Sequence, residues 1–266
     1  MATLLHYLRV YRQFLGNSVA MDMSFRVNFM LIFLVEVIWL LVLVAGNEVI
    51  FSHTATFGPW SKQEYLMFAI LVALNDQVFV SFFAPNFWGL SETLREGTMD
   101  FILLKPLNAM FIVFSRIQRV SSMVAASLSL VWLVMVAHDM ETPWDFSRWV
   151  SLGVLFVLGM CLRLGIEIIV GSFMFITIEG EAVNVFRLNL QLFAKNPDFI
   201  YGTGARFLLT RIVPLCLVTT APIQWITSGE PWWTSAFWLG GLCLPVWLVA
   251  ILAWRTGLSR YESASS

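Results

Sequence analysis

Four ionisable side chains lie inside long apolar runs of this sequence, where a charge is costly unless it is paired or hydrated. They are Glu36, Asp76, Arg163 and Glu167. Arg163 and Glu167 are four residues apart, so on a helix they share one face and can form an ion pair. The four groups could line a polar path or carry a proton-linked site, or they could lock helices together. Both interpretations stay open, because pairing reduces the cost of burial but three acids outnumber one arginine.

No arrangement of residues in the sequence predicts catalysis by this chain. The sequence lacks the Gly-x-x-x-x-Gly-Lys-Ser/Thr phosphate loop, the His-Glu-x-x-His zinc motif and the Gly-x-Ser-x-Gly elbow. Its His residues are far apart, and its Cys residues lie in apolar runs without the spacing of metal ligands. We therefore expect no catalytic residue, metal site or cofactor on the chain itself. The net charge of −1 gives no reason to expect a nucleic-acid partner.

The elements that must position these charges are those of a membrane protein. Of the 266 residues, 59% are hydrophobic and 12% are charged, and the mean hydropathy is +0.78. Soluble domains carry roughly 25% charged residues. Six runs of about 20 apolar residues, each able to cross a ~30 Å hydrocarbon core, predict an all-α fold with six transmembrane helices. We place them at about residues 25–45, 65–90, 111–137, 149–178, 207–226 and 233–254.

Residues 1–23 form a separate amphipathic segment before the six-span region of residues 24–266. Apolar residues recur at helical spacing along one side, and Arg9, Arg12 and Gln13 lie opposite. A helix of this kind prefers the interface plane of a bilayer. We therefore expect an N-terminal interface helix with membrane lipid as its partner.

The distribution of basic residues orients the spans. One side collects both termini and the two long interruptions at residues 90–119 and 179–211, whereas the other side has only Lys62 and Arg148. Because Lys and Arg concentrate in cytoplasmic loops, both termini are predicted to be cytoplasmic. The basic residues assigned to that side are Arg9, Arg12, Arg26, Arg95, Lys105, Arg116, Arg119, Arg187, Lys195, Arg206, Arg211, Arg255 and Arg260.

The connector at residues 90–107 has the pattern of a folded element. Ser91 and Thr98 are candidate N-caps of two short helices. Gly97 permits a turn between these helices, and Pro106 stops the second. The prediction is a bent knob whose polar edge and apolar ridge are formed by Glu92, Arg95, Glu96 and Asp100, and by Phe101, Ile102, Leu103 and Leu104. A flexible linker would have no such ridge, but a helix lying on lipid would also be amphipathic.

Three stretches resemble bacterial ABC transporter permeases of the ABC-2 exporter type. Residues 96–107 read Glu-Gly-Thr-Met-Asp-Phe-Ile-Leu-Leu-Lys-Pro-Leu and resemble that group's connector, G-x-x-D-x-x-L-x-(R/K)-P-L. Asn196–Tyr201 and Arg211–Pro214 are similar to its Y-P-x-x-I-Y … x-x-x-P segment, with Asn196 where an aromatic residue is common. Residues 258–265, Leu-Ser-Arg-Tyr-Glu-Ser-Ala-Ser, are similar to its L-x-x-Y-x-S-A tail. The likeness covers nearly the whole chain in length, order of spans and amphipathic start.

This resemblance implies a function and partners. It implies a permease half of an ATP-driven exporter that moves a hydrophobic or amphiphilic compound outward across a bacterial cytoplasmic (inner) membrane. A second permease, identical or similar, would complete a dimer, and two separate ABC ATPase subunits would carry ATP and Mg. The connector would rest in a groove on the ATPase through Glu92, Arg95, Glu96, Asp100, Phe101 and Leu104. Of these, we expect Glu96, Asp100 and Phe101 to carry the contact.

Two other functions stay open. The chain could be the membrane subunit of an ABC complex that does mechanical or signalling work without transport. It could also be a small intramembrane enzyme that uses Glu36, Asp76 and Glu167, although no nucleophile or metal site accompanies these acids. The sequence does not indicate the substrate, nor whether the dimer has two identical halves.

Overall fold

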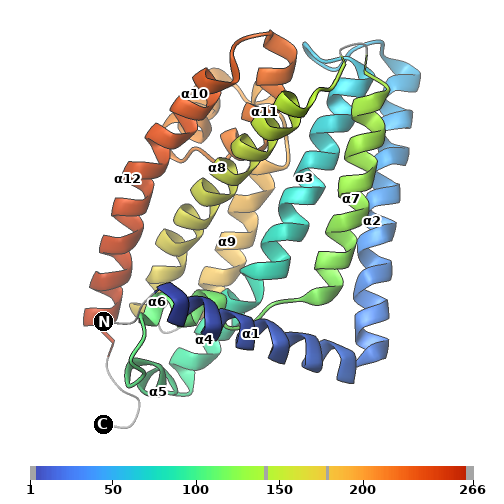
Figure 1. The fold of residues 1–266 in the computed structure, drawn as a ribbon. Coiled ribbons are helices and arrows are strands. Elements are labelled where there is room, and N and C mark those ends of the chain that lie inside the picture. Colours follow the sequence, from blue (N-terminus) through green and yellow to red (C-terminus); the bar gives the residue numbers. More distant parts are fainter. Residues whose placement is uncertain (1–3, 141–142, 178–179, 262–266) are drawn as a thin grey trace.

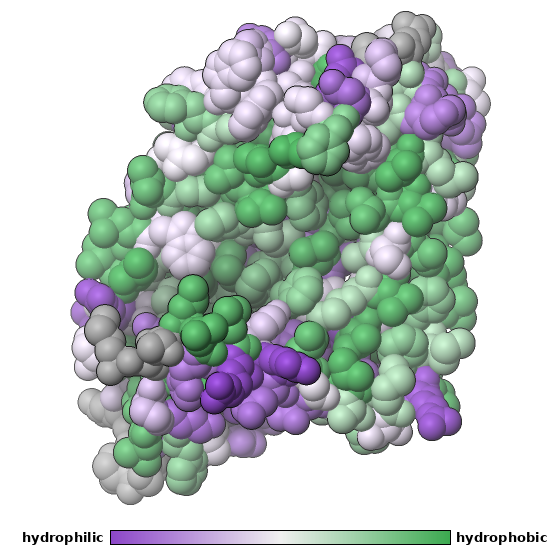
Figure 2. Space-filling model, viewed as in Figure 1, coloured by the Kyte–Doolittle hydropathy of each residue, from purple (hydrophilic) through white to green (hydrophobic). Residues whose placement is uncertain are grey.

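The described chain is a bundle of helices. The computed structural model describes residues 4–140, 143–177 and 180–261. These residues contain no strand, which confirms the all-α prediction. Figure 2 shows an apolar band across the middle of the bundle, with hydrophilic residues gathered toward its upper and lower ends. The helices long and apolar enough to cross a membrane are α2 (Arg26–His53), α3 (Lys62–Phe82), α7 (Val120–His138), α8 with the short helix η1 (Phe146–Phe175) and α12 (Trp232–Ser259).

Helix α1 (Leu4–Ser24) lies across the lower end of the bundle (Figure 1). Ser18 Oγ donates to Gln118 Oε1 over 3.1 Å, which ties α1 to the chain just before α7. Asp22 Oδ2 accepts from the backbone N–H of Val120 at 2.7 Å, and so caps the first turn of α7. The helix predicted within residues 1–23 corresponds to α1, and residues 1–3 lie outside the described residues.

The predicted second and third spans are both shorter than expected. The second ends at Phe82, because Pro85 starts a new helix, α4 (Ala84–Arg95). The third is broken between α6 (Ala109–Ser115) and α7. The buried Asn86 side chain bridges this break, since it donates to the Ile117 carbonyl and accepts from the Ile117 N–H, both at 2.8 Å. With these backbone groups satisfied, the irregular segment can be buried.

The fifth crossing is made by α9 (Gly180–Ala194), where a cytoplasmic interruption was predicted. α9 begins beside α4 at the lower end, because a Cβ on Gly180 would lie 2.9 Å from the Ser91 Cβ. It then runs upward along α8 (Figure 1). The chain after α9 reaches the opposite end, since the Phe199 ring lies 5.0 Å from the ring of Trp60 in the α2–α3 loop.

The segment predicted as the fifth span is instead a bent pair of helices. α10 (Thr203–Phe207) continues into the π-helix η3 (Leu208–Ile212), and α11 (Leu217–Ser228) is bent by 101° from them. The two outer ends of the pair, Thr203 and Ser228, line one cavity at the upper end. The pair therefore enters and leaves at the same side, so the span predicted at residues 207–226, which Pro214 and Pro222 were expected to break, does not cross the bundle. The crossings in the described chain are made by α2, α3, α7, α8, α9 and α12.

This correction changes the assignment of four basic residues. Arg187 lies within the bundle, and Lys195 follows α9, whose 15 residues rise about 22 Å from the lower end. Arg206 and Arg211 line the cavity at the upper end. The lower end retains the other basic residues assigned to it, so the asymmetry is smaller but keeps its sign.

Helix α8 is the centre of the bundle and packs against α3, α9, α11 and α12. The approach to α11 is close, because a Cβ on Gly159 would lie 2.7 Å from the Val218 carbonyl oxygen. Small residues allow such backbone contact between membrane helices, where dispersion replaces the hydrophobic effect. The close packing of α8 fixes the helix that carries two of the four predicted charges.

Candidate functional site

Arg163 of α8 is buried against α3. Its Nη1 lies 2.8 Å from Asp76 Oδ1 and also donates to the Asn75 side chain, and its guanidinium carbon lies 4.2 Å from the centroid of the Phe79 ring. Asp76 has a second cationic partner, because Lys195 Nζ lies 2.5 Å from Asp76 Oδ2. One carboxylate on α3 thus joins α8 to the end of α9.

A second buried cluster lies on α8 and α9. Arg187 Nη1 lies 2.9 Å from Glu167 Oε2, and Gln191 donates to the other carboxylate oxygen. Asn184 Oδ1 accepts from the Arg187 guanidinium at 3.3 and 3.4 Å. The same guanidinium lies 4.4 Å from the centroid of the Phe87 ring of α4. Every charged oxygen of Glu167 therefore has a donor in a site that excludes water.

The predicted pairing of Arg163 with Glu167 is wrong, although both are buried on α8 as expected. Each is paired across helices instead, Arg163 with Asp76 and Glu167 with Arg187. The sequence interpretation missed Arg187 and Lys195 because it assigned their segment to the cytoplasm. A signal was present, since Asn184, Arg187 and Gln191 recur at spacings of three and four residues in a segment rich in apolar residues.

Glu36 of α2 does not belong to either cluster. Its Oε1 accepts from Ser122 Oγ of α7 at 3.5 Å, and no ion pair of Glu36 is found in the part of the chain that the structure describes. The predicted group of four therefore divides between two ion-paired clusters, one with Asp76 and Arg163 and one with Glu167, and Glu36 is separate from both. Each cluster joins different helices, which is the geometry of a helix lock.

The two clusters differ in their access to the surroundings. The Arg187 and Glu167 side chains are only 1% and 3% exposed, whereas those of Lys195 and Asp76 are 43% and 25% exposed. Asn189, on the outward face of α9, is also exposed. Charged and amide groups at this depth are unfavourable against lipid. The inner cluster is closed to its surroundings, and the outer one is partly exposed.

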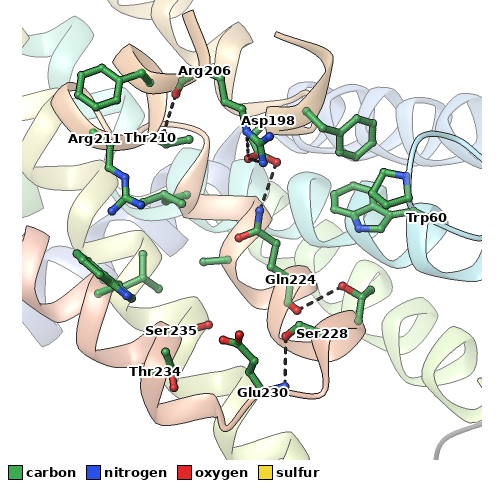
Figure 3. A pocket seen from close by; sticks show the side chains of 18 of the residues that line it. Trp60, Asp198, Arg206, Thr210, Arg211, Gln224, Ser228, Glu230, Thr234 and Ser235 are labelled. Atoms are coloured by element: carbon green, nitrogen blue, oxygen red, sulfur yellow. Dashed lines mark hydrogen bonds and ion pairs between the residues drawn. The ribbon is translucent and has the colours of Figure 1, made fainter. Parts of the chain in front are cut away.

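A cavity of about 860 Å³ lies at the upper end, between the bent pair, the start of α12 and the α2–α3 loop (Figure 3). The buried Asp198 accepts from Arg206 Nε at 2.8 Å and from Gln224 at 3.3 Å. Arg211 stands over the Trp238 ring at 5.0 Å, and Glu230 points toward the hollow from the α11–α12 turn. The cavity therefore combines charged, amide and aromatic groups at the side opposite the connector.

The connector folds as a bent element, as predicted, but with different caps. Ser91 lies inside α4 and its Oγ donates to the Trp88 carbonyl, so it is not an N-cap. α4 ends at Arg95, and Gly97, two residues later, has a left-handed φ of 70°. The Thr98 N–H donates to the Thr93 carbonyl and the Gly97 N–H to the Leu94 carbonyl, which is the Schellman arrangement. Thr98 then precedes the five-residue helix α5 (Met99–Leu103) without a side-chain cap.

Helix α5 presents an apolar tip at the lower end of the molecule. Phe101 is 68% and Leu104 is 82% exposed, whereas Met99 and Ile102 are buried and anchor the element. The predicted ridge is thus exposed except at Ile102. Glu92, Arg95 and Glu96 are exposed along its edge, and Figure 2 shows apolar residues at the lower tip beneath a hydrophilic group.

The knob also contacts the end of α12. Burial, together with the nearby Asp100 carboxylate, raises the pKa of the Tyr261 phenol above its ordinary value. Asp100 is half-buried here, less accessible than Phe101. The rest of the tail motif, residues 262–265, lies outside the described residues, as does Glu141 of the α7–α8 loop.

These features define a polytopic α-helical membrane protein with charged pairs inside the bundle and a protruding knob at one end. Among the described residues, no cluster of His, Cys, Asp and Glu could hold a metal ion. The sequence of residues 30–265 matches the ABC-2 family of transporter proteins, and the chain belongs to this family. It is therefore a membrane permease component of an ABC transporter, not itself catalytic, and the family associates with an ABC ATPase. No curated protein and no solved structure matches the chain.

Proposed function

We propose that this permease is half of an exporter that carries a hydrophobic or amphiphilic compound outward, with ATP and Mg bound only by separate ABC ATPase subunits. The observation that carries the proposal is the exposed knob of α5. An exposed apolar tip that is rimmed by Glu92, Arg95 and Glu96 has the composition of a protein contact. On an ABC permease, the partner for such a tip is the ATPase.

The arrangement of the basic residues supports a cytoplasmic knob. The knob end holds α1, the connector and the end of α12 (Figure 1). Its basic residues outnumber those at the opposite end, and such excess marks the cytoplasmic side. We therefore propose that the described ends of the chain face the cytoplasm of a bacterial cell whose inner membrane holds the protein.

Exposed polar groups at the end of α9 and on its surface support a dimer around a path. Lys195 and Asp76 pair at 2.5 Å but remain partly exposed, and Asn189 is exposed on another side of α9. Lipid would leave these groups poorly solvated, whereas a second permease half would shield them or enclose water beside them. The proposal is that two halves meet along α9 and that the transported compound passes between them.

The contact is tested by co-expressing the permease with its ABC ATPase. Phe101→Ala and Glu96→Lys should each weaken retention of the ATPase about tenfold, because truncating an interface anchor costs roughly 1–2 kcal/mol. Phe146→Ala is the matched control, since Phe146 is also strongly exposed but starts α8 at the opposite end. Unchanged retention and ATPase activity in both knob variants would refute the contact.

Transport itself is tested in sealed vesicles that contain the intact complex. ATP-dependent movement of a fluorescent amphiphile from the ATPase side to the opposite side is the expected result. ATP hydrolysis without such movement, for a broad panel of amphiphiles, would favour mechanical or signalling work instead.

A further inference from the structure

Helix α1 is fixed to the rest of the protein along one face. Its inward residues include Tyr7, Phe14 and Ser18, which lie at spacings of seven and four residues. The Tyr7 and Phe14 rings lie 4.9 and 6.4 Å from the Phe111 ring of α6. Ser18 holds Gln118, as described above. α1 therefore cannot roll freely, and its other faces have defined directions.

The exposed surface of α1 combines apolar and basic side chains near its N-terminal end. Leu4, Leu5 and Leu8 are strongly exposed. Arg9 and Arg12 are exposed as well, and neither forms an ion pair within the described chain. The only acid of α1 is Asp22, whose carboxylate is engaged by Val120. Figure 2 shows the result, a strongly hydrophilic group over α1 bordered by apolar residues.

At 100° per residue, Arg9 and Arg12 flank Leu5 and lie away from the protein-facing side, and Leu8 and Leu4 follow on the side of Arg12. α1 lies across the bundle, so the leucines can enter the hydrocarbon boundary while the guanidinium groups stay at the level of the headgroups. Guanidinium forms paired hydrogen bonds with phosphate oxygens. A headgroup with net negative charge complements two arginines that have no acid beside them.

We propose that α1 is a binding site for anionic phospholipid and that it passes the lipid signal to the connector. The occupant is the headgroup phosphate of a lipid with net negative charge, held by Arg9 and Arg12 while Leu4, Leu5 and Leu8 contact its chains. The second half of this inference rests on the proposed function of the connector.

The route from α1 to the connector is short. The Tyr7 hydroxyl accepts from the backbone N–H of Asn108 at 3.2 Å. Asn108 is the N-cap of α6, with its Oδ1 accepting from the Phe111 N–H, and it lies two residues after Pro106 at the end of the knob. A lipid that fixes the position of α1 therefore also fixes the C-terminal end of the connector, at Asn108.

Lipid binding is tested on the full-length permease alone, without the ATPase. Phosphatidylglycerol added to phosphatidylcholine micelles should raise the thermal midpoint, and native mass spectrometry should show retained phosphatidylglycerol with a preference of about 30-fold. The double variant Arg9→Gln/Arg12→Gln should lose the preference. Lys62→Gln/Arg148→Gln, which removes the same charge at the opposite end, should keep it.

Two further measurements distinguish a lipid site from a site for free phosphate and from a contact with the ATPase. Inorganic phosphate at equal concentration should not stabilise the permease, because it lacks chains for the leucines. Stabilisation by phosphate alone, or an undiminished lipid preference in the arginine double variant, would overturn the site. Stronger loss of ATPase retention than of lipid binding in that variant would assign the arginines to the protein partner instead.

The proposed effect of lipid on the connector is tested with the permease–ATPase complex in nanodiscs. ATPase activity should rise with phosphatidylglycerol content, and Tyr7→Phe should retain lipid binding but lose most of this dependence. Dependence that persists in Tyr7→Phe would overturn the route while leaving the lipid site standing. A complex whose activity does not respond to Phe101→Ala fails the proposed function, and that result is distinct from loss of lipid binding.

Discussion

Replacing Arg187 with Met tests whether the inner cluster is a lock. The substitution keeps most of the apolar stem of the side chain but removes the guanidinium group that lies 2.9 Å from Glu167. Glu167 would then be a buried carboxylate whose remaining donor is the Gln191 amide. The variant isolates the cost of an unpaired charge, because the volume of the site changes little.

The expected loss of stability in Arg187→Met follows from the burial of both side chains of the pair. Arg187 is 1% and Glu167 is 2% exposed, so neither gains water when the other is removed. Breaking a buried ion pair at one partner costs about 3–5 kcal/mol. The contact of Arg187 with the Phe87 ring adds up to about 1 kcal/mol. At about 2–4 °C for each kcal/mol, the thermal midpoint should fall by at least 6 °C or so.

A second substitution separates charge from packing. Adding Glu167→Gln to Arg187→Met removes the unpaired carboxylate and should restore more than half of the lost stability, since a neutral amide can pair with Gln191. In a double-mutant cycle, the two substitutions should therefore show a coupling energy above about 1 kcal/mol. Additive effects would mean that the pair contributes little beyond its packing.

The assay is thermal unfolding of the purified permease in one detergent at fixed protein concentration. Lys62→Met is the matched control, because Lys62 forms a 2.7 Å pair with Glu48 but both side chains are about half exposed. Such a surface pair contributes about 0–1 kcal/mol. An Arg187→Met midpoint no lower than that of Lys62→Met would refute the lock.

Two other predictions concern packing and the knob. Gly159→Ala should destabilise the permease by about 1–3 kcal/mol, because the new Cβ would lie 2.7 Å from the Val218 carbonyl oxygen. Gly153→Ala in the same helix is the control and should not destabilise it, because the space around Gly153 is open. The thermal midpoints of the two variants test this prediction. Asp100→Asn should lower the raised pKa of Tyr261 toward its ordinary value of about 10, as measured by ultraviolet difference titration against Tyr261→Phe. The stability linked to the raised pKa is present below the unfolded value and is lost as the pH rises through the folded one, so Asp100→Asn should shift that loss to lower pH.

Hydropathy and residue spacing predicted those parts of the fold that depend only on the local sequence. Long apolar runs predicted α2, α8 and α12, and Gly97 predicted the left-handed turn of the connector. The exposure of Phe101 and Leu104 also agrees with the predicted ridge.

The failures come from residues whose partners are distant in sequence. A helix of 15 residues with Glu181 and Arg187 fails any test for a membrane span on its own. It becomes acceptable only because Glu167, twenty residues earlier, supplies the opposite charge. The bent pair has the opposite problem, since its composition satisfies the test and only its geometry shows that it returns to the same side. Single-sequence periodicity contains neither piece of information.

The same distant partners connect the knob to the interior of the bundle. Phe87 and Ser91 lie on α4, which ends in the knob, and Phe87 packs on the Arg187 guanidinium. Asn184 of α9 lies 3.5 Å from the Phe87 carbonyl oxygen and 3.4 Å from Ser91 Oγ. We therefore expect a displacement of α4 to act on the inner cluster of α8 and α9. Because tightly packed interiors resist deformation, we expect the displacement also to move the far end of α9, next to Lys195 and its partly exposed ion pair.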